Sequence, residues 1–280
     1  MVRMANSSFF MQVRPERAVL GLEGPEAEAF LHNLVTADTL GLADGEARYA
    51  ALLTPQGKIL FDFFVLKTAA GYLLDCAALQ REDLVKRLMF YRLRAKVVIA
   101  ARDDLEVGVA ADRSQGAMAY VDPRTPLIGW RIIADKGKLN AGSSYHEARI
   151  ALGLADSDGD IGSGQLFPHE ANFDQFGAVS FSKGCYIGQE VVSRMEHRAT
   201  ARSRILPVAF DGAAPPRDAA IKSGEKTIGS VLSSVGNRAL ALIRLDRLGE
   251  AEEPLLTDNV STTVQKPAWI KYDVNSKGFA

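Results

Sequence analysis

A cysteine lies between two glycines in the segment from Lys183 to Glu190, which reads KGCYIGQE. A helix is predicted to begin near Gln189, and the backbone N–H groups at a helix start favour a thiolate. Lys183 would add positive charge, so the pattern favours a Cys185 thiol with a pKa below its ordinary value. The alternative is a small apolar residue in a tight turn, because free cysteine is commonly buried and inert. The residues alone leave both interpretations open.

Metal-ligand spacing is missing from the sequence. The two cysteines do not form a C-x-x-C pair, and the four histidines share no ligand spacing with one another or with Cys185. The stretch from Asp156 to Asp160 is only partly similar to a calcium loop, because Ile161 replaces the required glycine and Phe167 replaces the bidentate glutamate. No metal site is predicted.

Asp62 lies in an apolar strand predicted over residues 58–67. Alternate side chains of a strand point to opposite faces, and here both faces are apolar, so the carboxylate is predicted to be buried. A buried carboxylate needs hydrogen bonds or a cationic partner. Asp62 is therefore either a structural residue or a ligand-binding one.

Two segments are rich in cations. Residues 86–102 carry six Lys or Arg and no acid, and residues 181–204 carry five basic residues against two acids. A solvated helix face is the ordinary explanation, and a cationic rim that attracts a polyanionic ligand tail is the alternative. The interleaved aromatic residues of a nucleic-acid stacking surface are missing, so direct nucleic-acid binding is not expected.

The elements that must position these residues indicate an α+β protein. A turn at 54–57, with Pro55 and Gly57, predicts a hairpin between residues 47–53 and 58–67. Beyond residue 202, short β-like runs alternate with Gly, Pro and Ser, which is typical of a small β-barrel. Two domains are predicted, 1–200 and 201–280. Further strands are expected at 17–22, 71–77, 96–101, 105–111 and 127–134, and helices at 25–36, 79–92 and 144–154.

Composition excludes several classes of protein. The 33 Lys plus Arg and 34 Asp plus Glu nearly cancel, which argues against wholesale binding to nucleic acid or to a membrane surface. The sequence contains no apolar run near the roughly 20 residues that span a bilayer. Two cysteines fit a reducing compartment. The cytoplasm is the expected location, or the mitochondrial matrix if the protein is eukaryotic.

The segment 183–190 resembles the hallmark motif of the YgfZ family of folate-binding proteins, within the superfamily of the glycine-cleavage aminomethyltransferase (GcvT). The resemblance extends over residues 19–269. It also rests on an opening pattern at 30–38 with Tyr49 and Gly57, on Asp122-Pro123-Arg124, Gly129 and Arg131, on Arg149 and Gly153, on Pro168, Glu170 and Asn172, and on Gly224, Ile228-Gly229 and Ser233-Ser234 in the barrel.

This resemblance implies a GcvT-like body of two α+β modules and a C-terminal barrel around a central cleft. It implies that tetrahydrofolate, or a one-carbon derivative, binds there, and that the protein supports iron–sulfur enzymes, including some that modify tRNA. Iron–sulfur proteins or their assembly machinery are the implied partners. Cys185 and Lys183 are the implied catalytic residues. The implied folate-binding residues are Asn33, Asp38, Tyr49, Asp62, Arg131, Arg149, Glu170, Asn172, Tyr186, Gln189, Glu190 and Arg194.

One departure separates the chain from the aminomethyltransferase. That enzyme carries paired aspartates, whereas here Phe61 stands in place of the first and Asp62 retains the second. Phenylalanine can neither position nor charge-stabilise a folate amine. The pterin-binding glutamate of the enzyme is also missing near Gly129 to Arg131. Aminomethyl transfer from a lipoyl carrier is therefore the alternative function rather than the first one.

Overall fold

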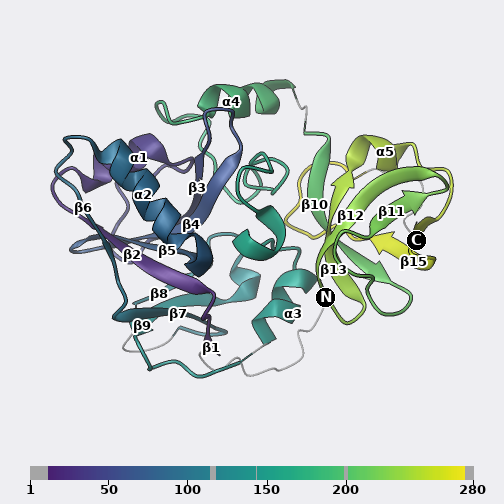
Figure 1. Ribbon diagram of the computed structural model, residues 1–280, viewed down its shortest axis with the longest axis horizontal. Helices are drawn as coiled ribbons and strands as arrows, with labels where there is room; N and C mark the ends of the chain where they lie inside the picture. Colours follow the sequence, from purple (N-terminus) through teal and green to yellow (C-terminus); the bar gives the residue numbers. More distant parts are fainter. Residues whose placement is uncertain (1–11, 114–117, 143, 199–200, 275–280) are drawn as a thin grey trace.

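The computed structural model describes residues 12–113, 118–142, 144–198 and 201–274. Two antiparallel sheets and their helices form a body, and a closed barrel lies beside it, on the right of Figure 1. The α+β fold class and the C-terminal barrel are confirmed. Within the described residues no helix is long and apolar enough to cross a membrane.

The larger sheet of the body has five antiparallel strands in the order β3-β4-β5-β2-β6. Two helices, α1 (Ala27–Leu34) and α2 (Arg81–Arg92), pack against one face of this sheet. The strands are β2 (Arg17–Glu23), β3 (Ala47–Leu53), β4 (Ile59–Thr68), β5 (Gly71–Ala77) and β6 (Val98–Ala101).

The predicted hairpin is confirmed as β3–β4. The amide of Gly57 donates to the carbonyl of Thr54 over 2.8 Å, and Gly57 has a φ of +81°, which a residue with a Cβ rarely adopts. Along β4, Phe61 and Phe63 pack towards the helices, whereas Phe64 and Leu66 pack towards the rest of the body. Both faces of the strand are thus buried, as the apolar pattern predicts.

The smaller sheet has the strand order β1-β7-β9-β8. Its strands are β1 (Gln12–Val13), β7 (Leu105–Ala110), β8 (Met118–Val121) and β9 (Trp130–Asp135), and helix α3 (Ser144–Ala151) follows. Strand β8 was not predicted. The strand predicted from 127 begins only at Trp130, because Thr125 accepts a hydrogen bond from the amide of Leu127 and a 3₁₀ turn forms at Pro126–Ile128.

The barrel closes in the order β10-β13-β12-β11-β14-β15. Its elements are β10 (Ser203–Phe210), β11 (Ala220–Ser223), β12 (Lys226–Val235), β13 (Arg238–Arg244), α5 (Leu245–Gly249), β14 (Leu255–Thr257) and β15 (Val260–Val264). One buried cluster contains Phe64 of the larger sheet, Ile133 of the smaller sheet and Leu240 of the barrel, so body and barrel share a core.

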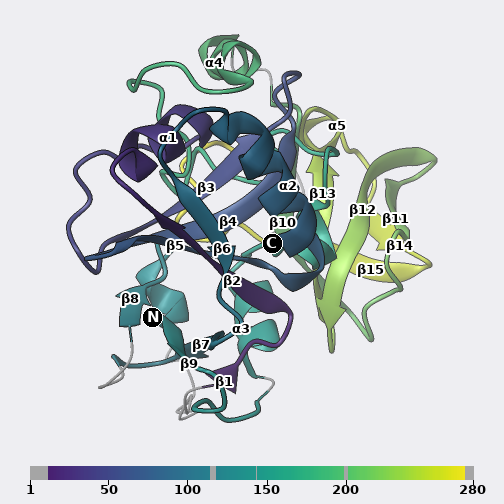
Figure 2. The ribbon, with the colours of Figure 1, turned by 60° about the vertical axis from the view of Figure 1, so that its left-hand side comes forward.

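Helix α4 (Gln189–Arg198) lies at the top of Figures 1 and 2, close to the turn between β3 and β4, and its Val192 is buried in the core that the two sheets share. Its start near Gln189 was predicted from the sequence. The segment that leads into it carries the cysteine motif.

Candidate functional site

The motif loop, defined as residues 181–188, presents the Cys185 thiol at the surface. Cys185 is exposed, whereas Cys76 is buried in β5. The interpretation of Cys185 as a buried packing residue is therefore wrong. Burial raises the pKa of the Cys76 thiol to about 12, so Cys76 is both inaccessible and protonated at neutral pH.

One of the two glycines flanking Cys185 is required by packing. Gly188 has a φ of +79°, and a Cβ there would lie 2.7 Å from the carbonyl oxygen of Thr54 and 2.9 Å from the Cα of Gly57. A Cβ on Gly184 would meet nothing within 4 Å. Gly188 therefore lets the end of the motif loop rest on the turn of the β3–β4 hairpin, and Gly184 is free of this constraint.

Lys183 anchors the other end of the motif loop to α1. Its Nζ donates to the carbonyls of His32, Val35 and Ala37, the last over 2.9 Å. An ammonium has three N–H donors, and the last carbonyls of a helix lack partners within the helix. Burial lowers the pKa of Lys183 to about 8. The structure gives Lys183 a positioning role, and a chemical role for its amine stays a prediction.

The other motif residues divide between core and surface. Tyr186 is buried beneath the Lys183 ammonium, which lies 5.0 Å from the ring centre, and burial raises its pKa to about 12. Gln189 begins α4 and is half-buried. Glu190 and Arg194 are exposed and form an ion pair of 2.5 Å one helical turn apart, a type of contact that contributes little to stability.

Two predicted residues lie at the end of α1, to which Lys183 is anchored. Asn33 and Asp38 are exposed, and an Asp38 carboxylate oxygen lies 3.3 Å from Nδ1 of His32. The negative charge of Asp38 also favours the protonated form of Lys183. These residues therefore belong to the same surface region as the motif loop.

A second group of predicted residues is buried between the two sheets. The hydroxyl of Tyr49 donates to Asp62 over 2.7 Å, and Asp62 is 3% exposed. Burial raises the pKa of Asp62, with opposition from the positive charge of Arg17. The burial predicted for Asp62 is confirmed, and its carboxylate is already hydrogen-bonded within the protein.

Arg131, the next residue of this group, forms a buried ion pair with Asp75. Its Nε and Nη2 donate to one Asp75 oxygen over 2.8 and 2.5 Å, and Arg17 Nε donates to the other over 2.7 Å. Burial alone would raise the pKa of Asp75, but the charges of Arg131 and Arg17 outweigh it and hold the pKa below its usual range. Sequence reasoning missed Asp75, although a lone acid in an apolar strand is the signal that identified Asp62.

Arg149 lines a hollow of about 170 Å³ at the edge of this network. Its Nη1 donates to Asp160 over 2.6 Å, and its Nε lies 3.3 Å from Asp156. A neighbouring hollow of about 430 Å³ shares Arg14 and Arg17 with it. The larger hollow is also lined by Arg81, Arg102 and Lys136.

The two remaining predicted residues act at the junction of body and barrel. Asn172 donates to the carbonyl of Ile205 over 2.7 Å and accepts from the hydroxyl of Tyr272 over 2.9 Å. Glu170 accepts from the amide of Phe167 over 2.9 Å. The predicted residues therefore lie in three places, the motif surface, the buried network and this junction, rather than around one cleft.

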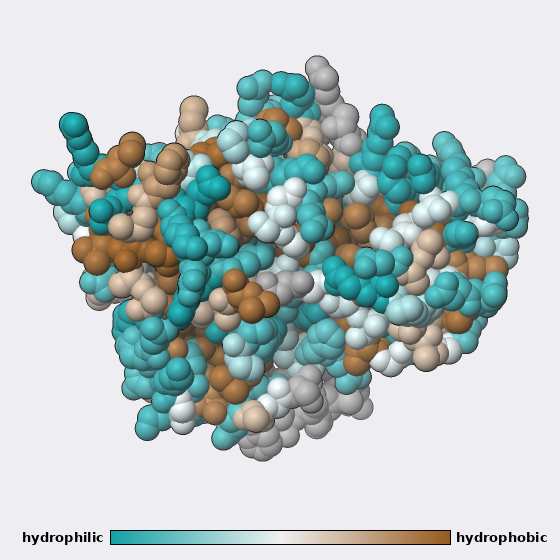
Figure 3. Space-filling view, viewed as in Figure 1, coloured by the Kyte–Doolittle hydropathy of each residue, from teal (hydrophilic) through white to brown (hydrophobic). Residues whose placement is uncertain are grey.

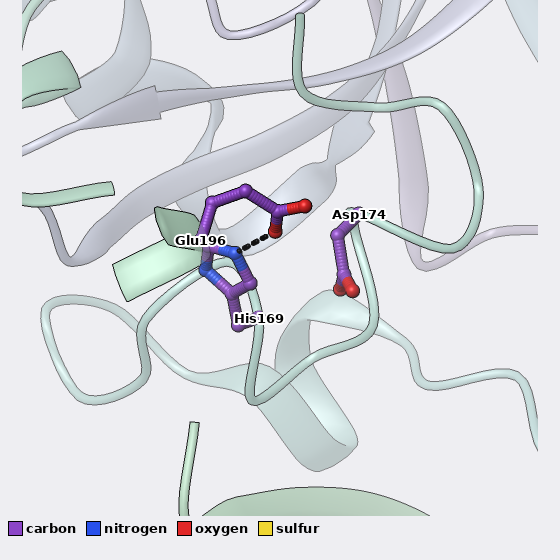
Figure 4. A group of neighbouring side chains, drawn as sticks. All are labelled: His169, Asp174 and Glu196. Carbon is purple, nitrogen blue, oxygen red and sulfur yellow. Dashed lines mark hydrogen bonds and ion pairs between the residues drawn. The ribbon is translucent and has the colours of Figure 1, made fainter. Parts of the chain in front are cut away.

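His169, Asp174 and Glu196 form a cluster in which a cation could be considered (Figure 4). Nε2 of His169 lies 2.9 Å from a Glu196 oxygen. Asp174 is paired with the Arg204 guanidinium at 2.5 Å, so its charge is already compensated, and a metal ion would lie beside a fixed positive charge. Among the described residues, the buried Nδ1 of His169 has no hydrogen-bond partner of the kind that supports a metal-bound histidine. The His169–Glu196 contact joins α4 to the loop beneath it.

The arrangement of body and barrel defines a member of the aminomethyltransferase-like fold. The chain superposes on glycine cleavage system aminomethyltransferase T from Bartonella henselae with a TM-score of 0.74 and 15% sequence identity. The superposition covers 93% of this chain and 86% of that enzyme. That level of identity establishes the fold alone.

Sequence comparison identifies the family. Residues 202–272 match the family described as CAF17, C-terminal beta-barrel domain. The chain is 33% identical over 283 residues, 85% of this chain and 72% of the relative, to the mitochondrial iron–sulfur cluster assembly factor IBA57 homolog of Pyricularia oryzae. It is 30% identical over 274 residues, 83% of this chain and 76% of the relative, to the mitochondrial iron–sulfur cluster assembly factor IBA57 of Homo sapiens. The chain belongs to the IBA57 family.

Proposed function

We propose that this protein supports the assembly of iron–sulfur clusters and acts through the thiol of Cys185. The observation that carries the proposal is the exposed thiol on a loop held at both ends, by Lys183 on α1 and by Gly188 on the β3–β4 turn. Holding a loop at both ends lowers the entropy lost when a ligand binds to it. The proposed process, iron–sulfur cluster assembly, is taken from the names of the relatives.

A thiolate on this loop can donate one ligand to iron. Iron–sulfur clusters usually take about four protein ligands, so one cysteine needs further donors. The other cysteine is buried in β5, and the His169–Glu196 pair is engaged at the far end of α4. The remaining ligands must then come from a partner protein, and the cluster is cargo passed between the two. Attack on an electrophilic carbon and exchange with a disulfide are the other reactions open to the thiol.

The test is deletion of the gene, followed by activity measurements on several iron–sulfur enzymes and on metal-free enzymes as controls. We expect activity to fall in iron–sulfur enzymes alone, including those that modify tRNA, and to return with the wild-type chain. Unchanged iron–sulfur activities would refute the proposal. The relatives are named mitochondrial, and we propose the mitochondrial matrix as the compartment if the protein is eukaryotic and the cytoplasm otherwise.

A reduced folate is the ligand that the YgfZ-like motif suggests, and we propose the two adjoining hollows as its place. The larger hollow fits an anionic tail better than a pterin, because five basic residues line it, among them Arg81, Arg102 and Lys136. Two acids, Asp103 and Glu106, lie in the same lining. The hollow at Arg149, of about 170 Å³, is smaller than the roughly 300–1,000 Å³ of ordinary ligand pockets. Calorimetry with tetrahydrofolate against wild type and Arg102→Glu tests this, and no heat at millimolar ligand would refute it.

Aminomethyl transfer is not expected. Phe61 packs with α1 and α2 on the face of β4 opposite Asp62, so the neighbouring position in the strand does not supply the second carboxylate of the aminomethyltransferase pair. Loss of a positioned electrostatic or proton-transfer group costs about 10²- to 10⁴-fold in rate. Sustained production of methylenetetrahydrofolate from an aminomethyl-lipoyl donor would contradict this view and favour the transferase.

A further inference from the structure

Large apolar side chains protrude from α2 and the segments next to it. Leu79 is 87% exposed, Phe90 69% and Leu93 83%, while Leu84 and Leu88 of the same helix are buried against the sheet. Figure 3 shows apolar surface on the side of the body that carries α2 and β6. Contiguous exposed apolar surface on a soluble protein marks an interaction site more often than an isolated exposed leucine does.

A groove of about 450 Å³ runs between α2 and the start of β4. Leu60, Phe61, Leu79 and Phe90 supply its apolar lining. Such a hollow accepts a side chain from another molecule, which a flat apolar patch does not. Asp83, Lys86, Arg87, Gln80 and Ser163 complete the lining.

Leu93, which ends α2, has an unfavourable backbone conformation. Its φ is +46° and its ψ −107°, a region where glycine is ordinarily found, yet its side chain is exposed rather than packed. A conformation of this kind costs on the order of 1–3 kcal/mol and persists where the surroundings impose it. The folded chain thus presents Leu93 to solvent at a cost that no internal contact of the side chain explains.

The charge around this surface is mainly positive, with Asp83 as the acid in the lining of the groove. Arg87, Arg92, Arg94 and Lys96 form no ion pair in the part of the chain that the structure describes, and Lys86 pairs only with Asp83. Residues 86–102 contain no acid. An apolar groove flanked by uncompensated cations is complementary to apolar residues flanked by acids.

We propose that this α2 surface, defined by Leu79, Arg87, Phe90, Leu93 and the groove between them, docks a segment of another protein that carries large apolar residues flanked by Asp or Glu. A second copy of the chain docked through the same surface would bring cations against cations. Residues 1–11 and 275–280 of this chain contain no acid to supply the partner's charge. A lipid surface would leave the groove unfilled.

The docked segment would lie near the motif loop. Leu60 in the groove follows Gly57 by three residues, about 10 Å along an extended strand, and Gly57 lies against Gly188. A partner seated on α2 is thereby brought to the side of the body that carries Cys185. This docking rests on the α2 surface and does not depend on the chemistry of Cys185.

The experiment is photo-crosslinking in cells with p-benzoylphenylalanine at position 90, and at position 127 as control, since Leu127 is also exposed, at 59%, on a different element. Mass spectrometry identifies the crosslinked segment. We expect a protein segment rich in Asp and Glu with large apolar residues, from position 90 only and also in a Cys185→Ala background. A basic segment, another copy of this chain, lipid alone, or no product above the control would overturn the proposal.

A synthetic peptide with the sequence of the crosslinked segment then allows the binding affinity to be measured. Phe90→Ser and Arg87→Glu should each weaken its affinity for the full chain, the first by about 30-fold, as for a central aromatic interface residue. Leu127→Ser should leave the affinity unchanged. Equal affinity in all variants would place the contact elsewhere. Retained docking in Cys185→Ala without rescue of iron–sulfur enzymes would separate this surface from the proposed function.

Discussion

Replacement of Lys183 by methionine tests how the motif loop is held. The substitution keeps the length of the side chain and removes the three hydrogen bonds to the carbonyls at the end of α1. Hydrogen bonds from a charged donor contribute about 1.5–3 kcal/mol each. Part of this is offset, because burial disfavours the ammonium, as its pKa of about 8 indicates, and because the group is partly exposed. We expect the free energy of unfolding to fall by about 2–4 kcal/mol.

The assay is urea unfolding of Lys183→Met beside Lys58→Met. Lys58 is the matched control, because it is also half-exposed and, among the described residues, its ammonium has only a distant contact, 5.7 Å from the ring centre of Phe167. The control should lose no more than about 0.5 kcal/mol. Hydrogen exchange in the Lys183 variant should rise in residues 31–37 and 180–188. Unchanged stability and exchange with loss of function would refute the positioning role and indicate a chemical one.

Three further results are expected. Gly188→Ala should lower the free energy of unfolding by about 1–3 kcal/mol, whereas Gly184→Ala, which meets open space, should stay near wild type. A thiol-alkylating reagent at neutral pH should modify the exposed Cys185 in the folded protein and the buried Cys76 only after unfolding. Peptide mapping would show which cysteine is modified. The stabilisation from Asp75, whose folded pKa lies below its unfolded one, should be present above about pH 4 and be lost as the pH falls through the folded value. Urea titrations from pH 6 to 2.5 should therefore show a steeper loss for wild type than for Asp75→Asn, and equal slopes would contradict it.

Local signals predicted much of the fold. Pro55 and Gly57 marked the β3–β4 turn, and the apolar alternation of β4 identified Asp62 as buried. The short β-like runs that alternate with Gly, Pro and Ser after residue 202 identified the barrel. These features depend on neighbours in sequence, which is why they can be read from the chain.

Contacts between distant residues were not predictable in this way. Lys183 reaches carbonyls about 150 positions away in α1, and Asp75 meets Arg131 across two sheets. The short strand β8 has few residues, and its pairing with β9 rather than its own pattern defines it. The motif suggested a chemical role for Cys185, which stays a prediction, while the exposure and support of this residue emerged only from the folded chain.

The proposal that the Cys185 thiol performs the function can be tested by complementation with variants of the two cysteines. A deletion strain is supplied with wild type, Cys185→Ala or Cys76→Ala, and iron–sulfur enzyme activity is measured beside the melting temperature of each purified protein. We expect Cys185→Ala to fail to restore activity at an unchanged melting temperature, because the Cys185 side chain is exposed, and Cys76→Ala to restore activity. Full restoration by Cys185→Ala would show that the thiol is not required for the function.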